Sequence, residues 1–368
     1  KTLADKGIKH CFLVTGGGAM HLNDALGLEK RIKYVCCLHE QACAMAAEGY
    51  AKASGQPGIV CVTTGPGGTN ALTGVMGAWQ DSIPMIIISG QLKRSLMITA
   101  APHLKLRQIG EQEYNIVDSV RPMTKFAKTI MTADEIPQAI EDAWTICQSG
   151  RPGPVWLDIP LDIQAADLPT HACPTPAPYI MPEETAWHNS LKTLIEHIDH
   201  AERPALIVGN GVHLAKAEVE FLMFAEATGI PVLTTLSGID LIPSDHPLFF
   251  GRPGILGDRA ANFILQNSDL LIVIGSRMNP RICGFNYVTT ARAAFKVMID
   301  IDKNELEKPT FRPDLKIHAD AKSFLNELLK KHPKTISTEK WIGYCQRMRA
   351  TYSVTLPEHR ERRDYVSS

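Results

Sequence analysis

The amino-acid sequence predicts an α/β protein with two doubly wound parallel-sheet domains. Short apolar runs recur along the chain, each ends near Gly or Thr, and each is followed by a helical pattern. Runs that are apolar throughout are typical of parallel strands covered on both faces. The length of 368 residues suits two domains, and 45% hydrophobic with 21% charged residues is the composition of a globular protein.

The first domain is predicted over residues 1–165. Its expected strands are the apolar runs at residues 11–14, 34–38, 59–62, 84–91 and 155–159. One helix is especially clear, with Asp134 as its predicted cap and Gly150 as its expected end. Its apolar stripe follows helical spacing and consists of Ile136, Ile140, Ala143, Trp144 and Cys147.

A proline-rich linker is predicted over residues 166–185, because repeated prolines fix an extended path. The second domain is expected over residues 186–333, with strands at 205–208, 231–235, 270–274 and 295–301 and a helix that runs from Ala215 to Gly229. Residues 334–368 form a tail with a helix predicted around 342–352, and they make no third domain.

Composition excludes several classes of function. A net charge of -1 gives no electrostatic reason to expect nucleic acid or an anionic membrane as partner. The longest apolar runs have the length of strands and are too short to span a bilayer. Nine cysteines without C-x-x-C spacing indicate free, mostly buried thiols, with no zinc or other metal ligand set. We therefore expect a reducing compartment, the cytoplasm.

The strongest pattern joins two motifs near the first strands. H39-E-Q-A opens a helix of small and apolar residues, and T63-T-G-P-G-G-T-N70 follows about twenty-five residues later. Taken alone, Glu40 suits the first turn of any helix, where a carboxylate complements the helix dipole. The glycine turn alone is a weak anion-binding signal, and it is not a P-loop because no G-K-[ST] follows.

Together these motifs resemble the pyrimidine-binding domain of thiamine-diphosphate enzymes, most closely the acetolactate synthase group. The resemblance implies that Glu40 hydrogen-bonds the N1′ atom of the aminopyrimidine ring and favours the tautomer that removes the proton from thiazolium C2. A carboxylate with this task is expected in an apolar pocket. The resemblance also implies that the second motif forms the pyrimidine site through Thr63, Gly65, Pro66, Gly67 and Asn70.

Two further segments of the first domain carry the resemblance. The loop T15-G-G-G corresponds to a first active-site loop, in which Gly17 and Gly18 leave space beside the cofactor. Gln112 corresponds to a glutamine that reaches the catalytic pocket of the partner subunit, although it also suits an ordinary loop. His103 and Lys105 lie in the same segment, and we expect both to be exposed.

A flavin site is the least determined part of the resemblance. In the flavin-bearing branch, the arginine of G150-R-P-G-P-V, here Arg151, contacts FAD, and the glycines and prolines around it also suit a plain turn. Arg277 and Asp302 follow strands of the second domain, where nucleotides bind doubly wound sheets. This chain has Ile255-Leu256 where acetolactate synthases carry Met-His, so the sequence leaves FAD open.

Enzymes of this family hold the diphosphate through Mg²⁺ in a third domain marked by G-D-G and a later Asn. Here Gly257-Asp258 is the one partial match, and it lies in the second domain. Without a metal ion, the concentrated negative charge of the diphosphate would be poorly compensated. We therefore expect the Mg²⁺ ligands in a domain that these residues do not contain, so that the sequence is a fragment and inactive alone. A separately encoded diphosphate-binding subunit stays as an alternative.

The resemblance implies an acetolactate synthase-like transferase of branched-chain amino acid biosynthesis. It decarboxylates a 2-oxo acid, with pyruvate expected, and transfers the two-carbon unit to an acceptor. Because the family builds each site from two subunits, a homodimer or homotetramer is expected. A 2-oxo acid decarboxylase, an enzyme that acetylates a sugar ketone, and a non-catalytic nucleotide-binding protein with the same fold stay as alternatives.

Overall fold

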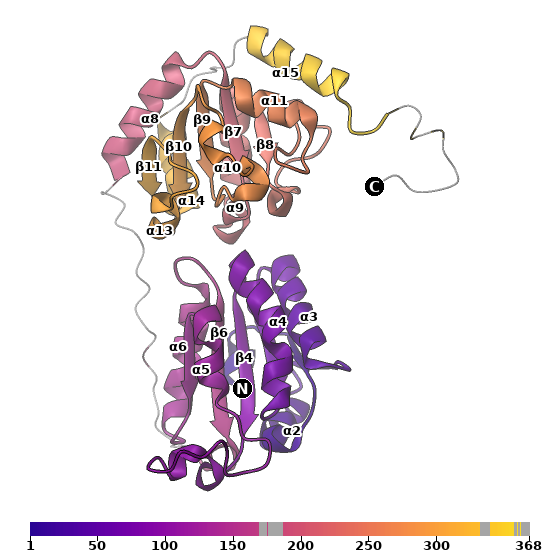
Figure 1. Cartoon of the computed structure of the whole chain (residues 1–368), viewed down its shortest axis with the longest axis vertical. Coiled ribbons are helices and arrows are strands. Elements are labelled where there is room, and N and C mark those ends of the chain that lie inside the picture. Colours follow the sequence, from indigo (N-terminus) through magenta and orange to yellow (C-terminus); the bar gives the residue numbers. More distant parts are fainter. Residues whose placement is uncertain (169–174, 176–186, 332–338, 357–358, 360, 362–368) are drawn as a thin grey trace. The chain divides into compact units, whose positions relative to one another are not determined.

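The computed structural model describes residues 1–168, 175, 187–331, 339–356, 359 and 361. These residues form two compact units, 1–180 and 181–368, and each unit has its own parallel sheet (Figure 1). Two doubly wound domains were predicted, and this fold class is confirmed. The predicted linker lies outside the described residues except for 166–168 and 175, as do residues 334–338 and 362–368 of the tail.

The first unit contains a six-stranded sheet in the order β2-β1-β3-β4-β6-β5, in which every neighbouring pair is parallel. Its strands are β1 (His10–Leu13), β2 (Lys33–Cys36), β3 (Gly58–Val62), β4 (Met85–Gln91), β5 (Phe126–Thr129) and β6 (Pro154–Pro160). β3, β4 and β6 lie in the interior of the sheet, and all or nearly all of their residues are buried. This burial explains why their sequences are mainly apolar.

Helices cover both faces of this sheet. They are α1 (Thr2–Asp5), α2 (Met20–Leu28), α3 (Glu40–Ser54), α4 (Pro66–Asp81), α5 (Ile116–Val120), α6 (Glu135–Gln148) and α7 (Leu161–Gln164). One core layer joins the sheet to α6 and α7 around Ile59, Ile86 and Val155. The other joins it to α3, α4 and α5 around Val60 and Trp156. The first unit is therefore a three-layer sandwich.

The strand order of the first unit changes direction between β1 and β3. From β1 the chain passes through α2 to β2 on one side, and it then returns through α3 to β3 on the other side. Adjacent loops leave the carboxyl ends of the two strands in opposite directions at such a switch point, which is where doubly wound sheets bind ligands. The loops concerned contain Gly17 and Gly18 after β1 and Thr63 to Gly67 after β3.

Helices α3 and α4 approach closely because small residues meet where they cross. A Cβ atom on Gly74 of α4 would lie 2.5 Å from the Cβ of Ala44 and 2.9 Å from the backbone nitrogen of Met45. Both neighbours belong to α3, and its backbone cannot yield as a flexible side chain can. This close contact fixes the spacing of the two helices that carry Glu40 and Asn70.

We expect Gly74→Ala to lower the free energy of unfolding by about 1–3 kcal/mol through overpacking. Gly27→Ala is the matched control, because Gly27 is also helical and a Cβ there would meet nothing within 4 Å. It should leave stability unchanged or raise it by up to about 1 kcal/mol, the gain in helix propensity. Urea unfolding measures both variants, and equal stability of the two would contradict the packing argument.

The second unit has a five-stranded parallel sheet in the order β11-β10-β9-β7-β8. Its strands are β7 (Pro204–Val208), β8 (Val232–Thr234), β9 (Leu270–Ile274), β10 (Phe295–Asp300) and β11 (Leu315–His318). Its helices are α8 (His188–His200), α9 (Gly211–Leu214), α10 (Glu218–Thr228), α11 (Arg259–Asn267), α12 (Pro280–Cys283), α13 (Lys303–Glu307), α14 (Ala321–Lys330) and α15 (Glu339–Thr351). Core residues lie on both faces of this sheet as well.

Three local details differ from the sequence predictions. The Asp134 side chain makes no capping hydrogen bond, and α6 ends at Gln148, so that Ser149 and not Gly150 follows it. The helix predicted from Ala215 begins at Glu218, since Lys216 has a φ of 53° that interrupts the helical path after α9. The tail helix starts at Glu339 and packs on the second unit, where the Trp341 indole donates to the Pro204 carbonyl at 2.9 Å.

Candidate active site at the first switch point

The loops at the β1/β3 switch point are held together by glycines and threonines. The Gly18 amide donates to the Thr63 hydroxyl at 3.1 Å, and the Thr64 hydroxyl donates to the Gly90 carbonyl at 3.1 Å. A Cβ on Gly18 would lie 1.9 Å from Thr64 Oγ1, so this glycine is required by loop packing. A Cβ on Gly17 would meet nothing within 4 Å, and Gly17 therefore leaves open space at the edge of the site.

Glu40 is the first residue of α3 and is buried, with 8% of its surface exposed. The helix begins here because His39 is extended and its Nδ1 accepts a hydrogen bond from the Gln41 amide at 3.1 Å. Glu40 Oε2 accepts a hydrogen bond from Asn70 Nδ2 at 2.9 Å. No described residue donates to Oε1 at hydrogen-bond distance. The carboxylate is thus oriented through one oxygen, with the other available to a ligand.

The turn before α4 places a bare backbone surface beside this carboxylate. Gly65 has a φ of 57°, which favours glycine, and Pro66 then starts the helix. A Cβ on Gly67 would lie 2.7 Å from Thr63 Cγ2 and 3.5 Å from Glu40 Oε1. The structure therefore brings together Glu40, Thr63, Gly67 and Asn70, four of the residues that the sequence selected.

Gln112 joins this group through its backbone. Its φ is 64°, and its carbonyl oxygen lies 2.3 Å from the position that a Cβ on Gly65 would occupy. The Gln112 side chain is exposed, so a ligand can reach it. His103 and Lys105 are exposed, as expected.

A buried polar cluster lies next to this site, and the sequence analysis missed it. Asp158 on β6 accepts from the Ser89 hydroxyl at 2.6 Å and from Gln91 Nε2 at 3.1 Å. The Trp156 indole donates to Ser89 Oγ at 2.8 Å. Burial is the main reason that the pKa of Asp158 rises to about 7. The available signal was the presence of Ser, Gln and Asp inside strands that are otherwise apolar.

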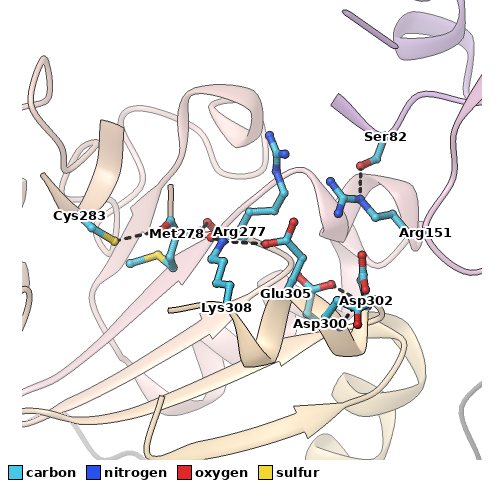
Figure 2. Close-up of polar contacts among 11 residues, drawn as sticks. Ser82, Arg151, Arg277, Met278, Cys283, Asp300, Asp302, Glu305 and Lys308 are labelled. Atoms are coloured by element: carbon cyan, nitrogen blue, oxygen red, sulfur yellow. Dashed lines mark hydrogen bonds and ion pairs between the residues drawn. The ribbon is translucent and has the colours of Figure 1, made fainter. Parts of the chain in front are cut away.

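Of the three residues expected near a flavin, Arg151 and Asp302 make contacts within the chain through their side chains, and Arg277 makes one through its main-chain carbonyl. Arg151 Nε donates to Ser82 Oγ at 2.8 Å within the first unit (Figure 2). In the second unit, the Asp302 amide donates to Asp300 at 2.9 Å, and the Asp302 carboxylate caps α13 by accepting from the Asn304 amide at 2.9 Å. Arg277 follows β9, and its carbonyl accepts from Lys308 Nζ, which also donates to Glu305 at 2.7 Å (Figure 2).

At the switch point of the second unit, between β7 and β9, the loops that follow the two strands contact each other through their backbones. The Gly211 amide donates to the Gly275 carbonyl at 2.9 Å, and a Cβ on Gly211 would lie 2.6 Å from the Gly275 Cα. Here the glycines allow one loop to pack on another. These contacts do not single out a flavin site.

Among the residues that the structure describes, no group of three or more His, Cys, Asp or Glu side chains is arranged to hold a metal ion. Nor do these residues include a helix with both the length and the apolar content needed to cross a membrane.

Comparison with known families assigns a domain to each of the two units. Residues 1–109 match the family model described as the thiamine pyrophosphate enzyme N-terminal TPP binding domain, and residues 191–328 match the thiamine pyrophosphate enzyme central domain. The chain belongs to the thiamine pyrophosphate enzymes. In this family's terms, the first unit contains the N-terminal TPP binding domain and the second unit contains the central domain.

Relatives of this thiamine pyrophosphate enzyme include acetolactate synthase large subunits. The probable large subunit of Methanocaldococcus jannaschii is 37% identical over 337 residues, which cover 89% of this chain and 54% of the relative. The large subunit of Corynebacterium glutamicum is 36% identical over 346 residues, which cover 93% of this chain and 54% of the relative. The large subunit of acetolactate synthase isozyme 2 of Escherichia coli is 33% identical over 351 residues, which cover 95% of this chain and 61% of the relative. The chain spans about half the length of these curated relatives.

Proposed function

We propose that this chain provides the pyrimidine-binding half of the active site of an acetolactate synthase-like enzyme. The whole enzyme decarboxylates a 2-oxo acid, with pyruvate as the proposed substrate, and transfers the two-carbon unit to an acceptor. The observation that carries the proposal is the burial and hydrogen bonding of the Glu40 carboxylate. The carboxylate is buried, Asn70 orients one oxygen, and the other faces the bare surface of Gly67.

The residues at this site fit the aminopyrimidine ring of thiamine diphosphate. When bound, the cofactor supplies a nucleophilic carbon and an electron sink for decarboxylation. Glu40 Oε1 can accept a hydrogen bond from a ring nitrogen and hold the proton there. Gly67 leaves space for the ring beside the carboxylate, because a side chain there would fill the region between Thr63 and Glu40.

The remaining residues of the proposed site shape the pocket around that carboxylate. Thr63 and Pro66 border the glycine surface, and Gly17 and Gly18 form the loop opposite. Asn70 keeps Glu40 in one orientation, which matters because a proton is transferred efficiently only over a short, fixed distance. We propose that the exposed side chain of Gln112 orients the substrate.

Further parts of the assembly stay predictions. We propose that groups outside the described residues hold the diphosphate and its Mg²⁺. FAD is a separate prediction involving Arg151, Arg277 and Asp302, and the visible absorption of flavin in the purified protein tests it. The free thiols of the described cysteines accord with the proposed cytoplasmic location.

We propose a homodimer or homotetramer, supported by large exposed side chains on the two helices that carry the site. Met45 on α3 is 46% exposed, and Met76 and Trp79 on α4 are 40% and 37% exposed. Apolar side chains grouped in this way are typical of surfaces that pack against another subunit. Sedimentation analysis of the full-length protein tests this, and a monomer would contradict it.

The full-length protein, supplied with thiamine diphosphate, Mg²⁺ and pyruvate, should release carbon dioxide and form acetolactate. Acetaldehyde in place of acetolactate would indicate a simple decarboxylase. Turnover only after a sugar ketone is added would indicate a different acceptor. Absence of carbon dioxide release would overturn pyruvate as substrate and favour a non-catalytic protein that retained the fold.

A further inference from the structure

The segment between β4 and α5 has little regular structure, yet it carries Gln112. It contains two short 3₁₀ turns, Arg94–Leu96 and Ile98–Ala100, and most of residues 101–109 are exposed. Such a segment has few apolar contacts that could fix its path. Gln112 also has a left-handed backbone conformation, which costs free energy for a residue with a side chain. Specific polar contacts must therefore hold Gln112 in place.

Glu113 supplies the most concentrated of these contacts. It is 8% exposed, and each of its carboxylate oxygens accepts a backbone hydrogen bond. Oε1 accepts from the Ile98 amide, and Oε2 accepts from the Ile109 amide at 2.7 Å. Within the part of the chain that the structure describes, Glu113 makes no ion pair. Two amides thus stabilise this buried carboxylate, and they come from opposite ends of the exposed stretch.

Neighbouring contacts fix the backbone on both sides of Gln112. The Glu113 amide donates to the Gly110 carbonyl at 3.2 Å, and the Gly110 amide donates to the Leu96 carbonyl at 2.9 Å. On the other side, Gln91 Nε2 donates to the Tyr114 carbonyl at 2.9 Å. The Gln112 carbonyl then packs on Gly65. The exposed side chain of Gln112 therefore projects from a backbone that is anchored at Gly110 on one side and at Glu113 and Tyr114 on the other.

We propose that Glu113 is a positioning residue for the catalytic pocket, and that its carboxylate closes the 98–113 loop so that Gln112 is held at the glycine turn. This inference rests on the proposed function, since it assigns Gln112 to the substrate. It explains why a carboxylate, and not an apolar side chain, is buried in a loop beside the site. An apolar residue would leave the Ile98 and Ile109 amides without these acceptors.

The test compares Glu113→Gln with Glu111→Gln in the full-length protein. Both variants remove one negative charge from a residue adjacent to Gln112, but Glu111 is exposed. Glutamine at 113 offers one carbonyl oxygen, and its amide group would face a backbone donor. We expect Glu113→Gln to lower kcat/KM for pyruvate by up to about 100-fold, the usual effect of displacing a substrate-positioning side chain by about 1 Å. Glu111→Gln should be close to wild type.

A double-mutant cycle with Gln112→Ala separates positioning from general damage. If Glu113 acts through Gln112, Glu113→Gln should cause little further loss in the Gln112→Ala background. A loss of equal size in both backgrounds would overturn the proposal, as would wild-type activity of Gln112→Ala. If the wild-type protein releases no carbon dioxide from pyruvate, the proposed function fails, and the hydrogen-exchange test below then decides whether Glu113 closes the loop.

Hydrogen exchange tests the loop without any turnover. Peptides covering residues 98–109 should exchange faster in Glu113→Gln than in Glu111→Gln, because glutamine offers one acceptor oxygen where the Ile98 and Ile109 amides use two. Equal protection in the two variants would overturn the proposal. If Glu113→Gln does not fold, Glu113→Asp takes its place. It keeps the charge but is one methylene too short to reach both amides, and it should show the same changes to a smaller degree.

Discussion

Replacing Glu40 by Gln should lower turnover by about 10²–10⁴-fold, the usual contribution of a positioned acid–base group. Glutamine has nearly the same shape, and its carbonyl oxygen can still accept the hydrogen bond from Asn70. The fold should therefore persist, while the group that holds the ring proton is lost. Steady-state kinetics of the full-length protein with saturating thiamine diphosphate measure the effect.

Glu135→Gln is the matched control for this change. Glu135 also begins a helix, α6, but it is a surface residue that pairs with Lys128. If a carboxylate in the first helical turn served only the helix dipole, both variants would lose up to about 1 kcal/mol of stability and neither would lose activity. Undiminished turnover in Glu40→Gln would remove Glu40 from its proposed role.

The stability of the first unit should fall as the pH rises, because of Asp158. Burial raises the pKa of this carboxyl from 3.8 to about 7 in the folded protein. Between these values the folded state binds more protons than the unfolded state, so each increase in pH favours unfolding. Below about pH 4 the group is protonated in both states, and above about pH 7 the full cost is present. The pKa shift corresponds to a loss on the order of 4 kcal/mol in the free energy of unfolding.

Asp158→Asn isolates this contribution, because it removes the charge and keeps the shape. Relative to the variant, the wild-type protein should lose stability steadily from about pH 4 to about pH 8, as measured by urea unfolding. Asp134→Asn removes one negative charge at the exposed surface. The difference in stability between this variant and the wild-type protein should not show the same steady change with pH. Parallel pH profiles for the wild-type and Asp158→Asn proteins would show that burial does not hold this proton.

Continuous apolar runs were sufficient to predict most of the two sheets. β9 was predicted with its observed bounds, and β7 and β10 differ by one residue. β5 and β11 were missed because both are short strands at the edge of a sheet. β5 and β11 are only partly buried, so their sequences, with Lys128 in β5 and Lys316 in β11, do not have the apolar pattern of a fully buried strand.

The candidate site was predicted in part, from the order of its motifs. The motifs selected both Glu40 and Asn70, but the hydrogen bond between them depends on how closely α3 and α4 pack. The polar residue inside an apolar strand was the one sign of Asp158, and its partners could not be inferred because Ser89 and Gln91 lie more than sixty residues away in the sequence. Glu113 resembled any charged loop residue, because only the folded loop shows that it is buried.

The exposed side chain and anchored backbone of Gln112 separate two properties that usually change together. Glu113, Gln91 and Gly65 fix the main chain around residue 112, and none of their contacts uses its side chain. With Gln112 in its proposed role, substitutions at position 112 should therefore alter the choice of substrate with little effect on folding. In a lineage of related proteins or in a directed-evolution library, this position offers a short route to a new acceptor or donor, whereas the three supporting positions should tolerate little variation.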